Sequence, residues 1–172
     1  MESKSELLMR SLRNYYKEND KINLVLPVIT QQTRISLRIL DWLVTNYSKK
    51  FNSNYLLGKE NIYIYKSYKN QLKSYSKKLF DPFCRRERIM INKNTLQNTQ
   101  ENDPEVIITT VGQLNFFKWA IENKILDYAV KNLDEIELDM NSSIKKFDLK
   151  GVKQKVPPLM LNNKGPSIIK FC

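Results

Sequence analysis

The sequence predicts an α+β protein that is predominantly helical and folds as a single compact domain with a small sheet. Apolar residues recur at helical spacing over several long segments, and short β-branched runs lie between them. The chain has 172 residues, of which 41% are apolar, so it can bury a core of its own. We expect a globular domain over 1–145 and a loosely attached, basic, proline-containing tail over 146–172.

The first third of the chain predicts two helices around a short extended segment. Apolar residues at near-helical spacing predict a helix over 6–18. The apolar run 22–29 contains Pro27, which favours a short edge strand or a buried extended segment. A second helix is predicted over 34–49, with Thr33 as the cap of its start.

The middle third predicts a loop, a helix and a proline stop. Asparagines and a glycine predict a loop over 52–58, and residues 62–65 fit either a strand or the beginning of the next helix. That helix is predicted over 66–79. It ends before Asp81-Pro82, because the residue preceding a proline is disfavoured in the α conformation.

Two further strands and a polar loop follow. The β-branched runs 88–91 and 106–108 predict strands. The Asn-, Thr- and Gln-rich stretch between them, 92–104, predicts an exposed loop or linker.

The last third predicts helices followed by the tail. Thr110 and Gln113 have the T-x-x-Q spacing of a capping box, which places a helix start at Thr110. Around 122–124 this helix either turns or continues into a helical pattern that extends to Met140. The periodicity is lost after about Ser143, where the tail begins.

The composition excludes several classes of chemistry. Without histidine there is no Ser-His-Asp or Cys-His catalytic system. Two cysteines cannot supply the about four Cys and His ligands of a structural zinc site. Four glycines do not form the glycine-rich phosphate-binding loops. We therefore expect a non-enzymatic protein with no cofactor and no bound metal, and carboxylate–Mg²⁺ chemistry is kept as a third alternative.

Neither a membrane span nor a secretory signal is predicted. No run approaches the about 18 apolar residues that a transmembrane helix needs, and the N-terminus lacks the apolar stretch of a signal peptide. Cys84 and Cys172 lie far apart and do not form a disulfide framework. We expect an intracellular protein with free thiols.

The positive charge is concentrated in one stretch of the chain. Of the formal net charge of +11, a net +9 comes from residues 47–93, which hold 12 Lys and Arg against 3 Asp and Glu. On the helix predicted over 66–79, four lysines fall within about 80° of one another at 100° per residue. Ser67 and Ser74 flank this stripe as hydrogen-bond donors suited to phosphate oxygens. The stripe and the arginines that follow it are Lys66, Lys69, Lys73, Lys77, Arg85, Arg86 and Arg88.

These seven residues are the candidate nucleic-acid-binding site. Neutralising several backbone phosphates releases counterions and gives salt-dependent binding with little sequence preference, to DNA or to RNA. The alternatives are an ordinary solvated amphipathic helix, a surface that docks on an acidic protein, and a contact with anionic lipid.

Residues 110–141 have the opposite sign, with 3 lysines against 6 acids, a net charge of −3. This charge argues against a DNA-binding helix-turn-helix there, because the recognition helix would bring carboxylates towards phosphates. The acidic helix is either an amphipathic core helix with an acidic solvent face or a contact for the basic segment of a neighbouring copy, which would give a homo-oligomer.

Some single residues have two interpretations. Asp41 fits either a catalytic carboxylate or an ion pair with Arg34 or Arg38. Asp81 is predicted to cap or turn the chain. Phe116 and Trp119 could stack on bases, but their helical spacing favours the core.

Three ordered segments carry a resemblance to a known family: 35–47, 67–78 running into 80–86, and 109–120. Together they resemble a family of small basic proteins of large nucleocytoplasmic DNA viruses, over about residues 35–141. The resemblance implies a viral protein with a genome-associated, transcription-associated or virion role. It also implies a place in the host cytoplasm, the viral factory or the virion. The leading hypothesis is a viral nucleic-acid-binding protein, and the alternative is a virion structural or minor capsid component that docks on an acidic viral protein.

Overall fold

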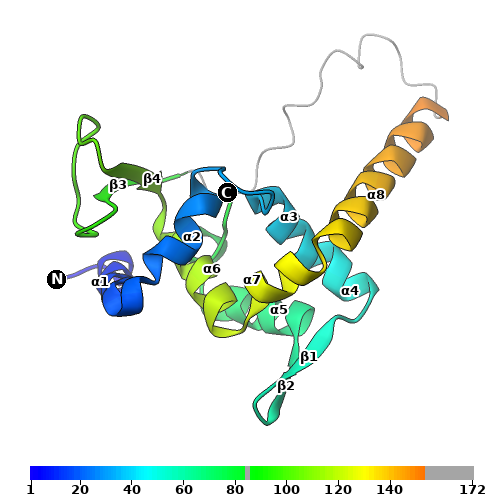
Figure 1. Ribbon diagram of the computed structural model, residues 1–172, viewed down its shortest axis with the longest axis horizontal. Coiled ribbons are helices and arrows are strands. Elements are labelled where there is room, and N and C mark those ends of the chain that lie inside the picture. The colour runs from blue at the N-terminus through cyan, green and yellow to red at the C-terminus, as the bar shows by residue number, and fades with distance from the viewer. Residues whose placement is uncertain (84–85, 154–172) are drawn as a thin grey trace.

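The computed structural model describes residues 1–83 and 86–153 and confirms a predominantly helical α+β fold (Figure 1). In place of one small sheet it has two, each an antiparallel pair of strands. The main helices are α1 (Lys4–Lys17), α2 (Ile22–Ile29), α3 (Leu37–Trp42), α4 (Ser48–Lys50), α5 (Ile64–Ser74), α6 (Val111–Glu122), α7 (Ile125–Lys131) and α8 (Leu133–Lys153). Short helical segments are η1 (Glu18–Asp20), η2 (Leu43–Tyr47) and η3 (Lys77–Leu79), and the strands are β1 (Asn54–Leu57), β2 (Glu60–Tyr63), β3 (Ile89–Asn92) and β4 (Val106–Thr109).

The N-terminal helix forms as predicted, but the extended segment predicted over 22–29 is wrong. These residues form α2, with Pro27 inside the helix. Ile22, Val25 and Val28 are spaced three residues apart and are all buried on the core side of α2. Burial of this face outweighs the one backbone hydrogen bond that a proline removes.

The helix predicted over 34–49 forms as α3, η2 and α4 in direct succession. It begins at Leu37 and not near Arg34, because Ser36 caps it. The Ile39 amide donates to Ser36 Oγ at 3.1 Å. Thr33 Oγ accepts instead from the Ile35 amide, outside the helix.

A β-hairpin replaces much of the loop predicted over 52–58. Strand β1 pairs with β2 in a register that joins Leu57 to Glu60. Gly58 takes a positive φ of 65° in the tight turn between them, a conformation that costs glycine little. Residues 62–65 combine both predicted alternatives, since β2 ends at Tyr63 and α5 begins at Ile64.

The helix predicted over 66–79 ends at Ser74, which corrects that prediction. Tyr75 is extended, with φ −115° and ψ 145°. Its ring stacks on that of Phe80, with centroids 6.2 Å apart and planes 17° apart. The aromatic contact therefore draws the chain away from the helix axis before η3 begins.

The two later strands form where they are predicted, and the structure pairs them with each other. Strand β3 pairs antiparallel with β4, and Ile89 lies opposite Thr109. The polar loop between them is held partly by Asp103, whose carboxylate accepts from Asn92 Nδ2 at 2.9 Å and Thr99 Oγ at 2.7 Å.

Helix α6 lies at the centre of the core and fixes the segment around η3. Thr110 Oγ accepts from the Gln113 amide at 3.0 Å, which confirms the predicted start. A Cβ atom at Gly112 would lie 2.6 Å from the Lys78 carbonyl oxygen, so only glycine permits this close approach. Asn115 Nδ2 donates to the Leu79 carbonyl at 2.8 Å. These contacts determine where Lys77 and Asp81 lie.

The chain turns between α6 and α7, where Lys124 has a φ of 58°. Helix α8 then extends away from the rest of the fold (Figure 1) and continues to Lys153, past the loss of periodicity at Ser143. The remainder of the predicted tail, 154–172, lies outside the described residues. Among the helices described, none is long and apolar enough for a membrane crossing.

Candidate polyanion-binding face

An aromatic cluster sets the orientation of α5. Tyr68, which is buried on α5, lies 5.9 Å from Phe80, 6.3 Å from Phe116 and 6.0 Å from Trp119 between ring centroids. Trp119 Nε1 also donates to Ser67 Oγ at 3.0 Å. Phe116 and Trp119 are thus core residues, as their spacing favoured, and they hold one side of α5 against α6.

The opposite side of α5 presents three exposed lysines. Lys66, Lys69 and Lys73 all fall on this side, within about 60° of one another at 100° per residue. Over this part of the helix, the arrangement predicted for the lysine stripe is present.

Lys49, on α4, joins this surface. Its ammonium nitrogen lies 5.5 Å from the centroid of the Tyr65 ring, and that of Lys69 lies 5.9 Å from the same centroid. We call the exposed lysines Lys49, Lys66, Lys69 and Lys73 the lysine face. Sequence reasoning missed Lys49, because periodicity within one helix does not show which neighbouring element packs beside it.

The lysine face has no acidic neighbour at ion-pair distance among the described side chains. The ion pairs within that part of the chain, at up to 4 Å, use other cations. These cations are Arg10, Lys21, Arg34, Lys50, Lys78, Lys93 and Lys118.

Lys77 leaves the stripe and lies near two carboxylates. Burial raises the pKa of Asp41 to about 6, the charge of Asp81 adds to the rise, and Lys77 opposes it. Burial also raises the pKa of Asp81, against the hydrogen bond from the Phe83 amide and the charge of Lys77. Asp41 therefore has Lys77 as its cationic neighbour, and the predicted pair with Arg34 or Arg38 is wrong. Asp81 turns the chain as predicted, since its Oδ1 accepts from the Phe83 amide at 2.8 Å.

The arginines after the proline do not extend the lysine face in a single row. Arg88 lines a separate cavity together with Arg38. Arg86 is exposed, and Arg85 lies outside the described residues. Lys78, next to Lys77, pairs with Glu87 at 2.7 Å.

The two flanking serines are already engaged within the fold. Ser67 Oγ accepts from Trp119, and Ser74 Oγ donates to the Asn70 carbonyl at 3.2 Å. That both hydroxyls serve as donors for phosphate oxygens stays a prediction: in this structure Ser74 donates within α5, and Ser67 is half-buried beside the indole.

The acidic residues of α8 bind cations and hydrogen-bond donors from the same chain. Arg34 reaches both Asp134 and Glu137, at 2.8 and 3.0 Å. Lys50 and Trp42 Nε1 both donate to Asp139, at 2.5 and 2.9 Å.

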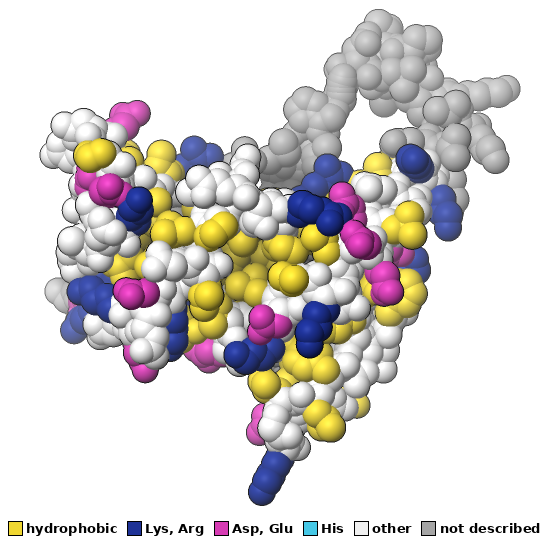
Figure 2. Space-filling model, viewed as in Figure 1, with side chains coloured by type: hydrophobic (Ala, Val, Ile, Leu, Met, Phe, Trp, Pro, Cys, Tyr) yellow, Lys and Arg dark blue, Asp and Glu magenta, His cyan; other side chains and the backbone are white. Residues whose placement is uncertain are grey.

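Two consequences follow for α8. Burial of Asp139 opposes its ionisation, but the two hydrogen bonds and the charge of Lys50 lower its pKa overall. The helix also buries Ile136 and Met140, as predicted for an amphipathic core helix with an acidic outer side. On the face of the molecule seen in Figure 2, cationic and anionic side chains are correspondingly interspersed.

The described side chains contain no group of three or more Cys, Asp or Glu placed to hold a metal ion. The lysine face itself offers exposed ammonium groups on two adjoining helices. It suits electrostatic contact with an extended anion.

The fold and this face define a small, mostly helical protein with an exposed cationic surface. The chain belongs to the DUF7197 family, a family of unknown function whose match covers residues 1–157. It is 42% identical over 132 residues to an uncharacterised protein, L507, of Acanthamoeba polyphaga mimivirus, a match that covers 71% of this chain. The chain spans about half the length of that relative, 48%. No solved structure matches the fold.

These matches confirm the resemblance to proteins of large DNA viruses. The family match also extends beyond 35–141, over α1, α2 and the whole of α8.

Proposed function

We propose that this is a non-enzymatic viral nucleic-acid-binding protein that contacts the phosphate backbone through the lysine face. The observation that supports this proposal best is the set of four exposed lysines from two adjoining helices, none with a described carboxylate within 4 Å. A cation without an internal partner is free to release a phosphate's counterion on binding.

The geometry of α5 suits a regular row of phosphates. Lys66 and Lys73 are seven residues apart, which corresponds to about 10 Å along the helix axis. That length matches about three base-pair steps of a duplex. Lys49, on the neighbouring helix α4 and close to the same Tyr65 ring as Lys69, widens the contact from a line to a patch.

The ligand would be recognised by charge and spacing with little sequence preference. Lysine is a flexible point charge with no planar fork for reading base edges. The aromatic side chains that the sequence offered for stacking on bases, Phe116 and Trp119, are in the core. Backbone contact without base readout is typical of a genome-associated role, which suits a relative encoded by a giant DNA virus.

Charge reversal with a matched control tests the proposal. The double variant Lys69→Glu, Lys73→Glu is compared with Lys124→Glu, Lys131→Glu, which makes the same change of net charge at exposed lysines of the α6–α7 region. Fluorescence anisotropy with a random-sequence duplex in about 50 mM NaCl gives both affinities. We expect a loss of more than about tenfold for the first variant and less than about threefold for the control.

Two results would overturn the proposal. One is the absence of duplex or single-strand binding by the unmodified chain in about 50 mM NaCl. The other is an equal loss for both double variants, which would mean that diffuse net charge and not the lysine face attracts the ligand.

A further inference from the structure

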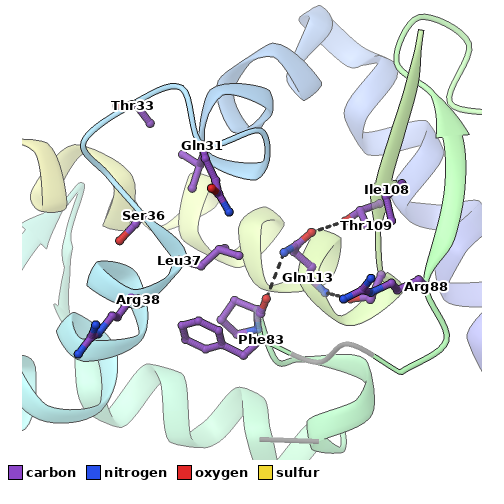
Figure 3. Close-up of a pocket in the computed structure, with 13 residues that line it drawn as sticks. Gln31, Thr33, Ser36, Leu37, Arg38, Phe83, Arg88, Ile108, Thr109 and Gln113 are labelled. Carbon is purple, nitrogen blue, oxygen red and sulfur yellow. Dashed lines mark hydrogen bonds between the residues drawn. The ribbon is translucent and has the colours of Figure 1, made fainter. Parts of the chain in front are cut away.

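A cavity of about 610 Å³ lies away from the lysine face, between the start of α3 and the junction of β4 with α6. Figure 3 shows it bounded on one side by the α2–α3 connection and on the other by β4, with the segment that contains Phe83 below. Its volume falls within the range of about 300–1,000 Å³ typical of small-molecule sites.

Two arginines flank this cavity from opposite sides. Arg38 lies on α3, and Arg88 directly precedes β3 (Figure 3). Both are exposed, and neither takes part in the ion pairs formed among the described side chains. Guanidinium groups bind phosphate and carboxylate oxygens in a bidentate manner, so an anionic group in this cavity would be recognised at one of the two arginines.

The wall beside Arg88 is rigid. Gln113 Oε1 accepts from Thr109 Oγ at 2.5 Å, and its Nε2 donates to the Pro82 carbonyl at 3.1 Å (Figure 3). Because the Gln113 amide and the Thr109 hydroxyl are buried and already bonded, they shape the cavity. A preformed wall of this kind reduces the entropy lost on ligand binding.

The remaining walls offer an apolar surface with a few exposed polar groups. Val28, Leu37, Ile108 and Phe83 line the cavity along with the side chains of Gln31 and Ser36. An apolar wall next to guanidinium groups suits a ligand that has an anionic part and an apolar part.

We propose that this cavity binds a nucleoside 5′-phosphate, with the phosphate at Arg88 and the base against the apolar wall. The ligand is either a free mononucleotide or the phosphorylated 5′ end of a strand, since the two present the same chemistry. This site is separate from the lysine face and does not depend on it.

Isothermal titration calorimetry on the full chain tests the site, with AMP as the probe. We expect AMP to bind and Arg88→Gln to weaken it by at least about tenfold. Arg38→Gln should weaken it less, by about threefold, because Arg38 is on the far side from the phosphate. Arg10→Gln is the matched control, because Arg10 pairs with Glu2 outside this cavity, and it should leave AMP affinity unchanged.

Adenosine and inorganic phosphate separate the two parts of the ligand. Each should bind more weakly than AMP, and Arg88→Gln should reduce phosphate binding without changing adenosine binding. No AMP binding, or AMP binding that Arg88→Gln leaves unchanged, would overturn the proposal.

Two further experiments identify the source of the ligand and distinguish this site from the lysine face. Displacement of AMP by a 5′-phosphorylated oligonucleotide, with none by its 5′-hydroxyl counterpart, would support a strand end. Displacement by neither would support a free nucleotide. The Lys69→Glu, Lys73→Glu variant should bind AMP normally, and Arg88→Gln should bind duplex normally, so that either site can fail alone.

Discussion

Lys49 and Lys50 are neighbours in the sequence, but they belong to two different electrostatic regions. Lys50 contacts Asp139 on α8 at 2.5 Å, in a cluster with Trp42. Lys49 lies above the Tyr65 ring with Lys69, in a region without a described acidic partner. Arg34 and Lys50 thus hold α8 to the rest of the fold, whereas the lysine face leaves its cations available. A local excess of positive charge therefore indicates a binding surface only where the fold supplies no carboxylate.

Removal of the aromatic support of the lysine face should have the largest effect on stability. Phe80 is fully buried and contacts Tyr68, Tyr75 and Trp119. Phe80→Ala should lower the free energy of unfolding by about 3–5 kcal/mol, because it removes a large buried ring and leaves a cavity. Urea denaturation measures this, and a loss below about 1 kcal/mol would show that the cluster does not support α5.

The two adjacent lysines give the sharpest test of the comparison. Lys50→Gln should destabilise the protein by about 1–2 kcal/mol, because Asp139 is mostly buried and would lose its cation. Lys49→Gln should change stability by less than about 0.5 kcal/mol, as expected for an exposed residue without an ion pair.

Duplex binding should show the reverse order for these variants. Lys49→Gln should weaken it by about threefold and Lys50→Gln should leave it unchanged. If Lys49→Gln and Lys50→Gln have the same stability and the same duplex affinity, the distinction between the two electrostatic regions is contradicted.

Ionisation of the buried Asp41 carboxyl group should lower the stability of the protein as the pH rises. Its pKa is about 6 in the folded protein against 3.8 ordinarily, so the folded state holds the proton more tightly than the unfolded chain. The contribution to stability is therefore present below pH 3.8 and is lost as the pH rises through about 6.

Asp41→Asn should remove this dependence and stabilise the protein at pH 8 by about 1–2 kcal/mol, a value reduced for solvent screening. Thermal unfolding from pH 4 to pH 8 measures it, with Glu101→Gln in an exposed loop as the control. A variant with the same pH dependence as the original chain would contradict the assignment.

The smallest expected effect concerns Lys77. Because it lies near Asp41 and Asp81, Lys77→Gln should change duplex affinity by less than about twofold, whereas Lys73→Gln should weaken it by about threefold. Equal losses would mean that the binding surface follows the predicted stripe beyond the end of α5.

Local patterns in the sequence predicted much of the fold. The spacing of apolar residues located α1 and α3, the T-x-x-Q pattern located the start of α6, and the β-branched runs located β3 and β4. The prediction for 22–29 is wrong because it rests on the local preference of Pro27. The three-residue spacing of Ile22, Val25 and Val28 indicates the helix that forms as α2.

The candidate site was predictable only in part. Lys66, Lys69 and Lys73 share a face because the period of one helix sets their direction. The position of Lys77 depends on where α5 ends, and that end follows from the contact of Tyr75 with Phe80. Lys49 and the pairing of Lys50 depend on packing between distant segments, which periodicity does not encode.

The salt dependence of duplex binding tests the lysine face most directly. If four lysines replace counterions, the logarithm of the binding constant should fall with the logarithm of NaCl concentration with a slope of about −3.6, and Lys69→Gln, Lys73→Gln should halve that slope. A slope that this double variant leaves unchanged would contradict the account.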